Sequence, residues 1–358
     1  MILSHRVQLD PTFKQTKYFV QACGTARFTW NWALSEWERQ HKTGLKPSGM
    51  KLKKQFNQIK YKQFPWISTM HRDSHAQPFA NLQKAYTSFF KSKAKYPRFK
   101  KKGTHDSFYV ANDKMKIKGK RVRLPVIGEI RMREALRFEG KIIGAVVSRS
   151  ADRWFVAIQV ETDLQKTRTS DNTVGVDLGL KNAITCSDGE VLDAPKPLKR
   201  QLKRLRKLSR WHSRKAKGSK NRAKSASRLA KLHWRISSAR NDFLHKASAK
   251  LCRENQTIVI EDLAVGNMMR NKRLSRAISD IGWSEFRRQL EYKSRLFGTQ
   301  IIVADRFYPS SKTCSVCGIV KSKLTLSERV FRCESCGAEL DRDINAAINL
   351  CTLGLGGK

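Results

Sequence analysis

TVGVDLGLKNAITCSDG, residues 173–189, is the stretch around which the chain is organised. Its first apolar run ends in Asp177, Lys181 and Asn182 suit a turn, and a second apolar run follows. This pattern predicts a buried strand that carries one carboxylate to the edge of a sheet, and then a hairpin that leads back. Asp177 alone is weak evidence for a site, because an aspartate here could simply cap the turn at Gly179.

A second strand of the same design follows later in the chain. QTIVIED, residues 256–262, is rich in β-branched residues and predicts an apolar strand that ends in Glu261. Asp262 comes next and faces the opposite side of a continuing strand, because successive side chains alternate. We therefore expect Glu261, and not Asp262, to reach a site shared with Asp177.

The third acidic position begins a helix. DRDINAAINL, residues 341–350, predicts a short helix with acidic residues in its first turn. Asp341 could be the N-cap of that helix, and Asp343 a favourable charge near its positive end. A shared site needs only one of the two, and we expect Asp343, with Asp341 as the alternative.

Asp177, Glu261 and Asp343 are the predicted catalytic carboxylates and the predicted ligands of Mg²⁺ or Mn²⁺. These ions prefer oxygen ligands and keep some of their waters, so that substrate phosphate oxygens can complete the coordination shell. Two ions about 4 Å apart can activate a water and stabilise the leaving oxygen in the hydrolysis of a phosphodiester. Without a metal, three carboxylates gathered in one place would repel one another strongly.

Four of the eight cysteines fall into two close pairs. The spacing C-x2-C-x15-C-x2-C predicts a structural zinc site with four thiolates. Gly318 and Gly337 follow the second cysteine of each pair and permit the left-handed turn that such a knuckle needs. The predicted zinc ligands are Cys314, Cys317, Cys333 and Cys336. The other cysteines, at positions 23, 186, 252 and 351, are interpreted as small core residues.

The composition indicates a polyanionic partner. Lys and Arg total 73 against 30 Asp and Glu, a formal charge of +43 in 358 residues. Nucleic acid is the leading candidate, since the basic residues occur along the whole chain and not on one amphipathic helix, as expected of a protein that lies on a membrane surface. No apolar run suits a membrane span and residues 1–10 do not resemble a signal peptide, so a cytoplasmic location is expected.

The first half of the chain predicts strands interrupted by helices. Residues 2–10 alternate like a strand, and three helices are then expected: one entered through Asp10, Pro11 and Thr12, one over 48–61 and one over 73–93. Short strand-like segments follow at 106–110, 116–124, 128–132, 141–149 and 154–161. They suggest a small β-barrel or sheet that the first strand joins, with the helices as an insertion and a linker over 162–172.

Residues 196–252 predict a basic helical hairpin. Leucines at helical spacing line each half, and KAKGSK, residues 215–220, supplies the break between them. Between Lys196 and Lys250, Asp242 is the only acidic residue, so local salt bridges have few partners and contacts to phosphates are favoured. Beyond Glu261, a further helix ending at Phe297 and a strand over 299–304 are expected.

Two other kinds of enzyme lack support in the sequence. The eight histidines form no compact set of metal ligands or hydrolytic triad, and none lies in the region of the cysteine pairs. A phosphate-binding loop of the form G-x-x-x-x-G-K-[ST] does not occur, so ATP hydrolysis has no candidate site.

These motifs, taken in order, resemble the TnpB family, the OrfB-type proteins of bacterial insertion sequences, which is similar to the miniature type V CRISPR effectors. The resemblance rests on GVDLGLKNAIT, IVIEDL, FYPSSKTCSVCG, CESCG and DRDINAAINL. It extends to TARFTWNWAL, YPRFKKKG and DIGWSEFRRQLEYKSRLFG, and so to nearly the whole chain. By position, Asp177, Glu261 and Asp343 match the family's catalytic acids, and the four paired cysteines match its zinc ligands.

The resemblance also implies a fold and its division into domains. The fold is an α/β RuvC-like (RNase H fold) nuclease domain with an inserted zinc ribbon, preceded by a β-barrel wedge domain that carries a helical recognition insertion. The implied boundaries are 1–10 and 96–168 for the wedge domain, 11–95 for the recognition insertion, 170–308 and 341–358 for the nuclease domain, and 309–340 for the zinc finger.

The function implied by the resemblance is RNA-guided cleavage of DNA. The partners would be a guide RNA transcribed from the end of the element and double-stranded target DNA with a short motif beside the target. Two alternatives remain open at this point. One is an RNA-guided or sequence-specific repressor without nuclease activity, and the other is a transposase that joins DNA strands with the same metal chemistry.

Overall fold

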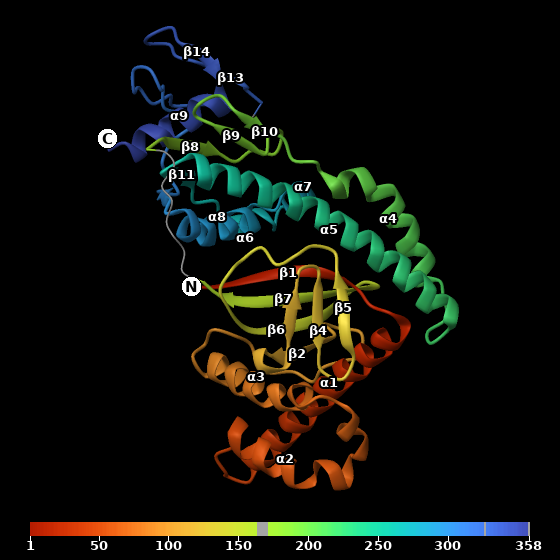
Figure 1. Ribbon diagram of the computed structural model, residues 1–358. Coiled ribbons are helices and arrows are strands. Elements are labelled where there is room, and N and C mark those ends of the chain that lie inside the picture. Colours follow the sequence, from red (N-terminus) through yellow and green to blue (C-terminus); the bar gives the residue numbers. More distant parts are fainter. Residues whose placement is uncertain (163–170, 326, 357–358) are drawn as a thin grey trace. The chain divides into compact units, whose positions relative to one another are not determined.

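The computed structural model describes residues 1–162, 171–325 and 327–356. The chain forms two compact units, Met1–Asp163 and Leu164–Lys358 (Figure 1). The predicted linker over 162–172 lies mostly outside the described residues. Among the described residues, no helix is both long and apolar enough to cross a membrane.

The first unit is built on an antiparallel sheet in the order β2-β6-β7-β1-β5-β4-β3. The strands are β1 Ile2–Asp10, β2 Ser107–Ala111, β3 Lys116–Lys118, β4 Arg121–Leu124, β5 Gly128–Met132, β6 Lys141–Ser150 and β7 Arg153–Glu161. The hydrogen-bonded order has β2 at one end and β3 at the other. The first strand joins the later ones, as the alternation of its residues predicted, while closure of the sheet into a barrel stays a prediction.

One predicted strand of this sheet was wrong. Residues 116–124 were expected to form a single strand, but they form the hairpin of β3 and β4. Gly119 has φ +54° and lies in the turn with Lys120, a left-handed conformation that suits glycine. The turn was missed because the residues on both sides of Gly119 alternate in the same sense.

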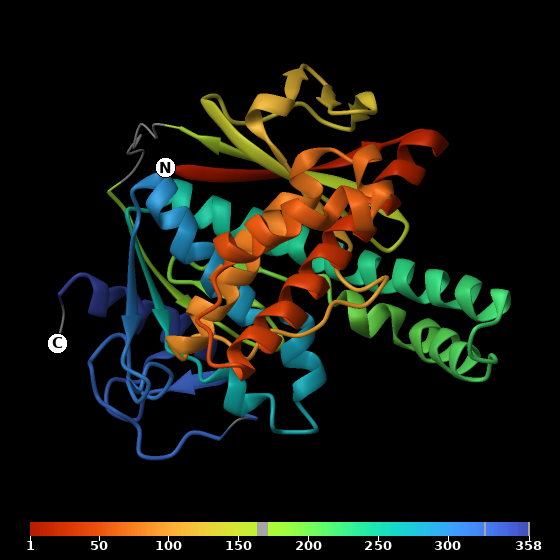
Figure 2. The same cartoon turned by 90° about the horizontal axis from the view of Figure 1, so that it is seen from below.

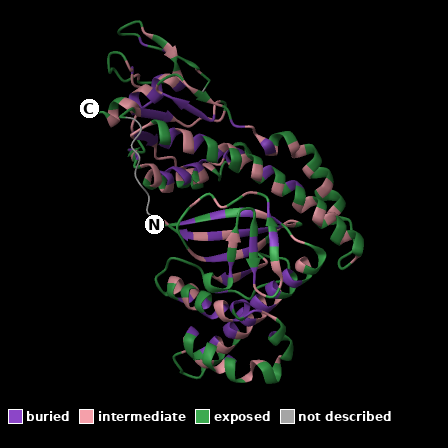
Figure 3. Ribbon diagram, in the orientation of Figure 1, coloured by how far each residue is buried: buried purple, intermediate pink, exposed green. Residues whose placement is uncertain are grey.

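Three helices lie between β1 and β2, as predicted: α1 Phe13–Lys42, α2 Gly49–Gln63 and α3 Arg72–Phe90. Thr12 caps α1 in a capping box with Gln15. The first half of α1 packs on the sheet through Phe19, and its second half packs on α2 and α3 through Trp37. This long helix therefore joins two hydrophobic cores, and Figure 3 shows buried residues both on the strands and on the helices of this unit.

Buried His75 makes the helical core sensitive to acid. His75 on α3 is 3% exposed, and burial, helped by Lys60 and His71, lowers its pKa from 6.5 to about 4. Below pH 6.5, His75 binds a proton in the unfolded chain but stays neutral in the folded chain. The free energy of unfolding should therefore fall as the pH drops from 6.5 towards 4, by up to about 3 kcal/mol. Urea denaturation of wild type and His75→Gln at both pH values measures this. An equal loss of stability in the two proteins would contradict it.

The second unit contains a mixed sheet in the order β10-β9-β8-β11-β12. The strands are β8 Thr173–Asp177, β9 Ile184–Cys186, β10 Val191–Leu192, β11 Thr257–Glu261 and β12 Gln300–Ala304. β8, β11 and β12 run parallel, and β9 returns antiparallel to β8, which confirms the predicted strand and hairpin. A further pair, β13 Val330–Arg332 and β14 Glu339–Asp341, lies in the cysteine segment.

Helices cover both faces of this sheet. On one face, Ile258 and Ile260 pack with residues of α5 Lys220–Glu254 and α8 Trp283–Phe297. On the other face, Val259 packs with Leu350 of α9 Arg342–Gly354. Neighbouring residues of β11 thus pack into the hydrophobic cores on opposite faces of the sheet. This explains why the strand is apolar throughout and does not alternate between apolar and polar residues.

Gly175 brings α9 into direct contact with β8. A Cβ atom here would overlap the carbonyl oxygen of Ala347 and the backbone nitrogen of Cys351, both on α9. Gly175→Ala should therefore displace α9 and cost about 2–3 kcal/mol of stability. Thermal unfolding measures the change, with Gly266→Ala as the control, because a Cβ at Gly266 meets nothing within 4 Å. A Gly175→Ala protein as stable as this control would contradict the close packing.

The predicted basic hairpin consists of α4 Pro197–Ser213 and α5, which lie side by side in Figures 1 and 2. The leucines of α4 are half-buried, and Leu232 and Ile236 of α5 are buried. Asp280 of α7 Ser275–Ile281 fixes the start of α4 by accepting hydrogen bonds of 2.9 Å from the backbone nitrogens of Leu198 and Lys199. This cap comes from far along the chain and replaces the local cap that α4 lacks.

Candidate functional site

Asp177 and Glu261 lie at the ends of neighbouring parallel strands. Val176 on β8 pairs with Ile260 on β11, and the two acids come directly after these partners. Because parallel strands end at the same edge of a sheet, the register brings both carboxylates to one place. The side chains are half-buried.

Asp343 reaches the same edge from α9. Asp341 is the N-cap of α9, and its Oδ1 accepts hydrogen bonds from the backbone nitrogens of Asp343 and Ile344 at 2.8 and 3.2 Å. Asp343 is buried, and its Oδ1 accepts a hydrogen bond of 3.3 Å from Nη2 of Arg342. Asp341 thus caps the helix, and the charge of Asp343 raises the pKa of Asp177 more than that of Asp341 does.

The raised pKa of Asp177 indicates that the other two acids lie near it. Burial, followed by the neighbouring charges of Glu261 and Asp343, raises the pKa of Asp177 from 3.8 to about 8. Arg342 opposes the shift without cancelling it. Oxygen ligands with an uncompensated negative charge are the donor set that a divalent magnesium or manganese ion fits.

The charges of Asp177, Glu261 and Asp343 repel one another, but the oxygen atoms of the three side chains are not spaced to hold one ion together. Within the described part of the chain, the cysteine cluster is the one group of three or more potential ligands spaced to hold one ion.

Side chains around Glu261 fix its surroundings. Ser310 Oγ donates a hydrogen bond of 2.6 Å to Glu261 Oε1. Asp262 forms ion pairs with Arg287, at 2.7 Å, and with Arg306. Glu261 and Asp262 thus bond different partners, while the choice of Glu261 over Asp262 for the site stays a prediction.

Two asparagines of α9, which the sequence interpretation missed, hold the loop that leads into the cysteine segment. Asn345 Nδ2 donates to the carbonyl of Thr313, and Asn349 Nδ2 donates to the carbonyls of Ser310 and Thr313, all at 2.7 Å. Both asparagines are buried. Their spacing of four residues on an apolar helix was the available signal, since buried polar side chains need partners.

The four paired cysteines form the second candidate site. Their sulfur atoms all lie within 4.8 Å of one another. Cys314 and Cys336 are 3.7 Å apart, and Cys317 and Cys333 are 3.5 Å apart. A tetrahedral ion with metal–sulfur bonds of about 2.3 Å requires sulfur atoms about 3.8 Å apart, so the cluster fits a four-thiolate metal site. Gly318 and Gly337 have φ +76° and +74°, which confirms the predicted left-handed turns.

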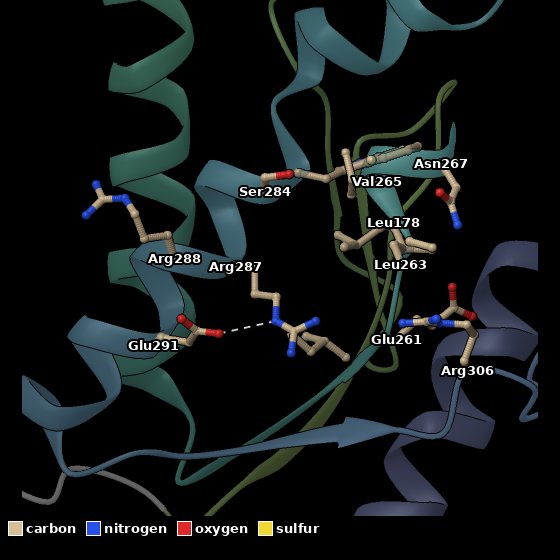
Figure 4. A pocket seen from close by; sticks show the side chains of 14 residues that line it. Leu178, Glu261, Leu263, Val265, Asn267, Ser284, Arg287, Arg288, Glu291 and Arg306 are labelled. Carbon is tan, nitrogen blue, oxygen red and sulfur yellow. Dashed lines mark hydrogen bonds and ion pairs between the residues drawn. The ribbon is translucent and has the colours of Figure 1, made fainter. Parts of the chain in front are cut away.

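A pocket of about 500 Å³ opens beside Glu261 (Figure 4). Leu178 and Leu263 form part of its wall, Ser284 and Arg287 of α8 form another part, and Arg306 lies near Glu261. This pocket could not be predicted from the sequence, because its residues come from four separate segments that only the fold brings together.

Comparisons with protein families match three parts of the chain. The OrfB_IS605 family, described as "Probable transposase", matches residues 155–272. A Cas12f1-like TNB domain matches residues 283–350, which include the four cysteines. A helix-turn-helix family matches residues 1–46, although these residues form the strand β1 and the single helix α1 here.

Curated relatives are similar over most of their length. A Streptomyces pristinaespiralis protein named "Putative RNA-guided DNA endonuclease" is 42% identical over 284 residues, covering 78% of this chain and 70% of the relative. The Escherichia coli K12 protein named "Putative RNA-guided DNA endonuclease InsQ" is 33% identical, covering 98% of this chain and 91% of the relative.

A solved structure has a similar fold. The cryo-EM structure of a Cas12f1 complex with a single guide RNA and target DNA matches with a TM-score of 0.56. It is 15% identical, and the match covers 95% of this chain and 83% of that protein.

Proposed function

The chain belongs to the TnpB family, the OrfB-type proteins of insertion sequences, and from this membership we propose that it is an RNA-guided DNA endonuclease of a transposable element. The observation that carries the proposal is that Asp177 and Glu261 end neighbouring parallel strands and that the charges of Glu261 and Asp343 raise the pKa of Asp177. A chain with a formal charge of +43 is suited to hold nucleic acid around such a site.

The three carboxylates would hold Mg²⁺ or Mn²⁺ together with the scissile phosphate. When bound, divalent metal activates water and stabilises the leaving oxygen of the phosphodiester. The protein supplies the arrangement: β8 and β11 fix two carboxylates through their register, and α9 adds the third. Ser310 holds Glu261 through Oε1, and among the described residues no hydrogen bond occupies Oε2, which could serve as a ligand.

The same proposal assigns roles to the other parts of the chain. Residues 170–308 and 341–358 would form a RuvC-like nuclease domain, and 309–340 a zinc finger held by Cys314, Cys317, Cys333 and Cys336. The first unit would be the wedge domain with its helical recognition insertion. The basic hairpin of α4 and α5 would hold phosphates of the guide RNA and of the RNA–DNA duplex, while base pairing selects the target.

Sequencing of the RNA that co-purifies with the protein tests the guided mechanism. The protein is expressed together with the DNA that flanks its gene in the element, and bound RNA is extracted. We expect one discrete species that ends in a variable guide segment. Mixed RNA, or none, would contradict guidance by RNA.

A cleavage assay then separates the nuclease from the two alternatives. Target DNA that matches the recovered guide is incubated with the complex and magnesium. We expect both strands to be cut by the one site, with hydrolysed ends. Joined strands would instead indicate a transposase, and tight binding of intact DNA would indicate a repressor.

A further inference from the structure

Apart from Glu261 itself, the residues that line the pocket beside it have no role in the metal chemistry described above. It is bounded by the ends of β8 and β11, by α6 Val265–Met268 and by the first turns of α8. Its volume of about 500 Å³ lies in the range of sites that bind small organic groups. Glu261 contributes to the pocket and to the carboxylate site, so the two sites are contiguous.

Part of the wall of the pocket is apolar. Leu178 follows β8, Ile260 and Leu263 lie at the end of β11, and Trp283 begins α8; Ile260 and Trp283 are buried. An apolar wall of this kind suits the flat face of a nucleobase better than a phosphate or a hydrated ion. Asn267 and Ser284 add groups that can bond the polar edge of a base.

Arginines lie around the opening, and an acid fixes two of them. Arg287 and Arg306 share the carboxylate of Asp262, and Arg287 also bonds Glu291. Among the contacts of the described residues, Arg306 bonds Asp262 through one terminal nitrogen, and its side chain is 52% exposed. Its remaining N–H groups are free to donate to a phosphate oxygen. The planar guanidinium group of arginine is well suited to such hydrogen bonds.

We propose that this pocket binds the base of the nucleotide that adjoins the cut, with Arg306 on a neighbouring phosphate of the same strand. The inference rests on the proposed nuclease function and adds a specificity site to it. A base seated here would fix the strand relative to Asp177, Glu261 and Asp343, so that loss of the base would misplace the scissile phosphate.

Two variants narrow the pocket from two different helices. Gly266 lines the pocket on α6, has no left-handed conformation, and has open space where a Cβ would lie, so Gly266→Leu adds bulk without an initial clash. Ser284 is a half-buried residue of the pocket wall on α8, so Ser284→Phe adds bulk from that helix. Thr352→Leu, at an exposed position near the end of α9, is a control of similar size outside the pocket.

The experiment measures single-turnover cleavage by the full-length protein loaded with its guide RNA. The DNA substrates carry one abasic nucleotide at each position around the cut in turn. With wild type and Thr352→Leu, we expect one position next to the cut to slow cleavage about tenfold or more, which is the loss of roughly one stacked base.

Filling the pocket should remove the dependence of the cleavage rate on the base next to the cut. Gly266→Leu and Ser284→Phe should cut the intact substrate about tenfold more slowly, and the abasic nucleotide should slow them no further, because both changes remove the same interaction. RNA binding and thermal unfolding of each variant establish that it is folded, and the second variant serves if the first fails to fold.

A flat profile of abasic substrates with wild type would overturn the inference, as would narrowed variants that keep the full abasic penalty. Failure of the proposed function looks different: wild type would not cut, or cutting would survive Asp177→Asn. Cleavage that depends on Asp177 but not on any base beside the cut would refute the pocket alone.

Discussion

Asp177→Asn should lower the rate of DNA cleavage about 1,000-fold or more, while binding of the guide RNA remains. The substitution keeps the shape of the side chain but removes a charged oxygen ligand from the site where Glu261 and Asp343 converge. Metal assistance contributes several kcal/mol to hydrolysis, and about 1.4 kcal/mol corresponds to each tenfold loss of rate. The measurement is single-turnover cleavage at saturating protein, beside a filter assay of RNA binding.

Asp343→Asn and Asp341→Asn form a matched pair for the same experiment. Asp343→Asn should resemble Asp177→Asn in its loss of cleavage. Asp341→Asn should retain cleavage within a few-fold, because asparagine caps helices about as well as aspartate. Equal losses in the pair would contradict the assignment of Asp343, and cleavage by Asp177→Asn, with contaminating nuclease excluded, would refute the site.

Cys336→Ser should abolish metal binding by the cysteine cluster and with it most of the cleavage. The four sulfur atoms have the spacing of a tetrahedral zinc site, and such a site contributes about 10–16 kcal/mol of binding free energy to the folding of the segment around it. The loop that leads into this segment is held by Asn345 and Asn349 on α9, the helix that also carries Asp343. Unfolding of the segment should therefore reach the carboxylate site.

Metal content and proteolysis measure this effect separately from activity. Wild type should contain one zinc per chain by mass spectrometry, and Cys336→Ser none, with new protease cuts within residues 309–340. Cys351→Ser is the control, because the half-buried Cys351 lies outside the cluster and serine can keep its bond to the Thr173 carbonyl. A Cys336→Ser protein with full zinc content would rule out this ligand set.

The parts of the fold that could be predicted from the sequence are those that depend on patterns within short stretches of the chain. The strand that ends in Asp177 and its hairpin were predictable because apolar runs and turn residues alternate there within 17 residues. The long first helix was predictable because its period of 3.6 residues persists over 30 residues and begins at the cap Thr12. The cysteine knuckles follow from spacing and from two glycines.

The parts that could not be predicted depend on contacts between distant segments. Asp280 lies about 80 residues after the start of α4, which it caps. The residues around Lys196 therefore contain no local pattern that predicts this cap. Asp341 and Asp343 could be ranked only provisionally, since both suit a first helical turn, and their separation into a cap and a buried acid depends on how α9 lies on β8. The pocket beside Glu261 likewise forms only when four separate segments of the chain come together.

The anchoring of the cysteine segment to α9 has a consequence for how such proteins can vary. The segment enters at Ser310 and Thr313, which Asn345 and Asn349 hold, and it leaves at Asp341, where the same helix begins. Both of its ends are therefore fastened to one rigid element, and lengthening a loop between fixed ends adds only a small entropic cost. Residues added between the two cysteine pairs should therefore leave the carboxylates in their places, so this stretch is a natural location for grafting a new peptide into the protein.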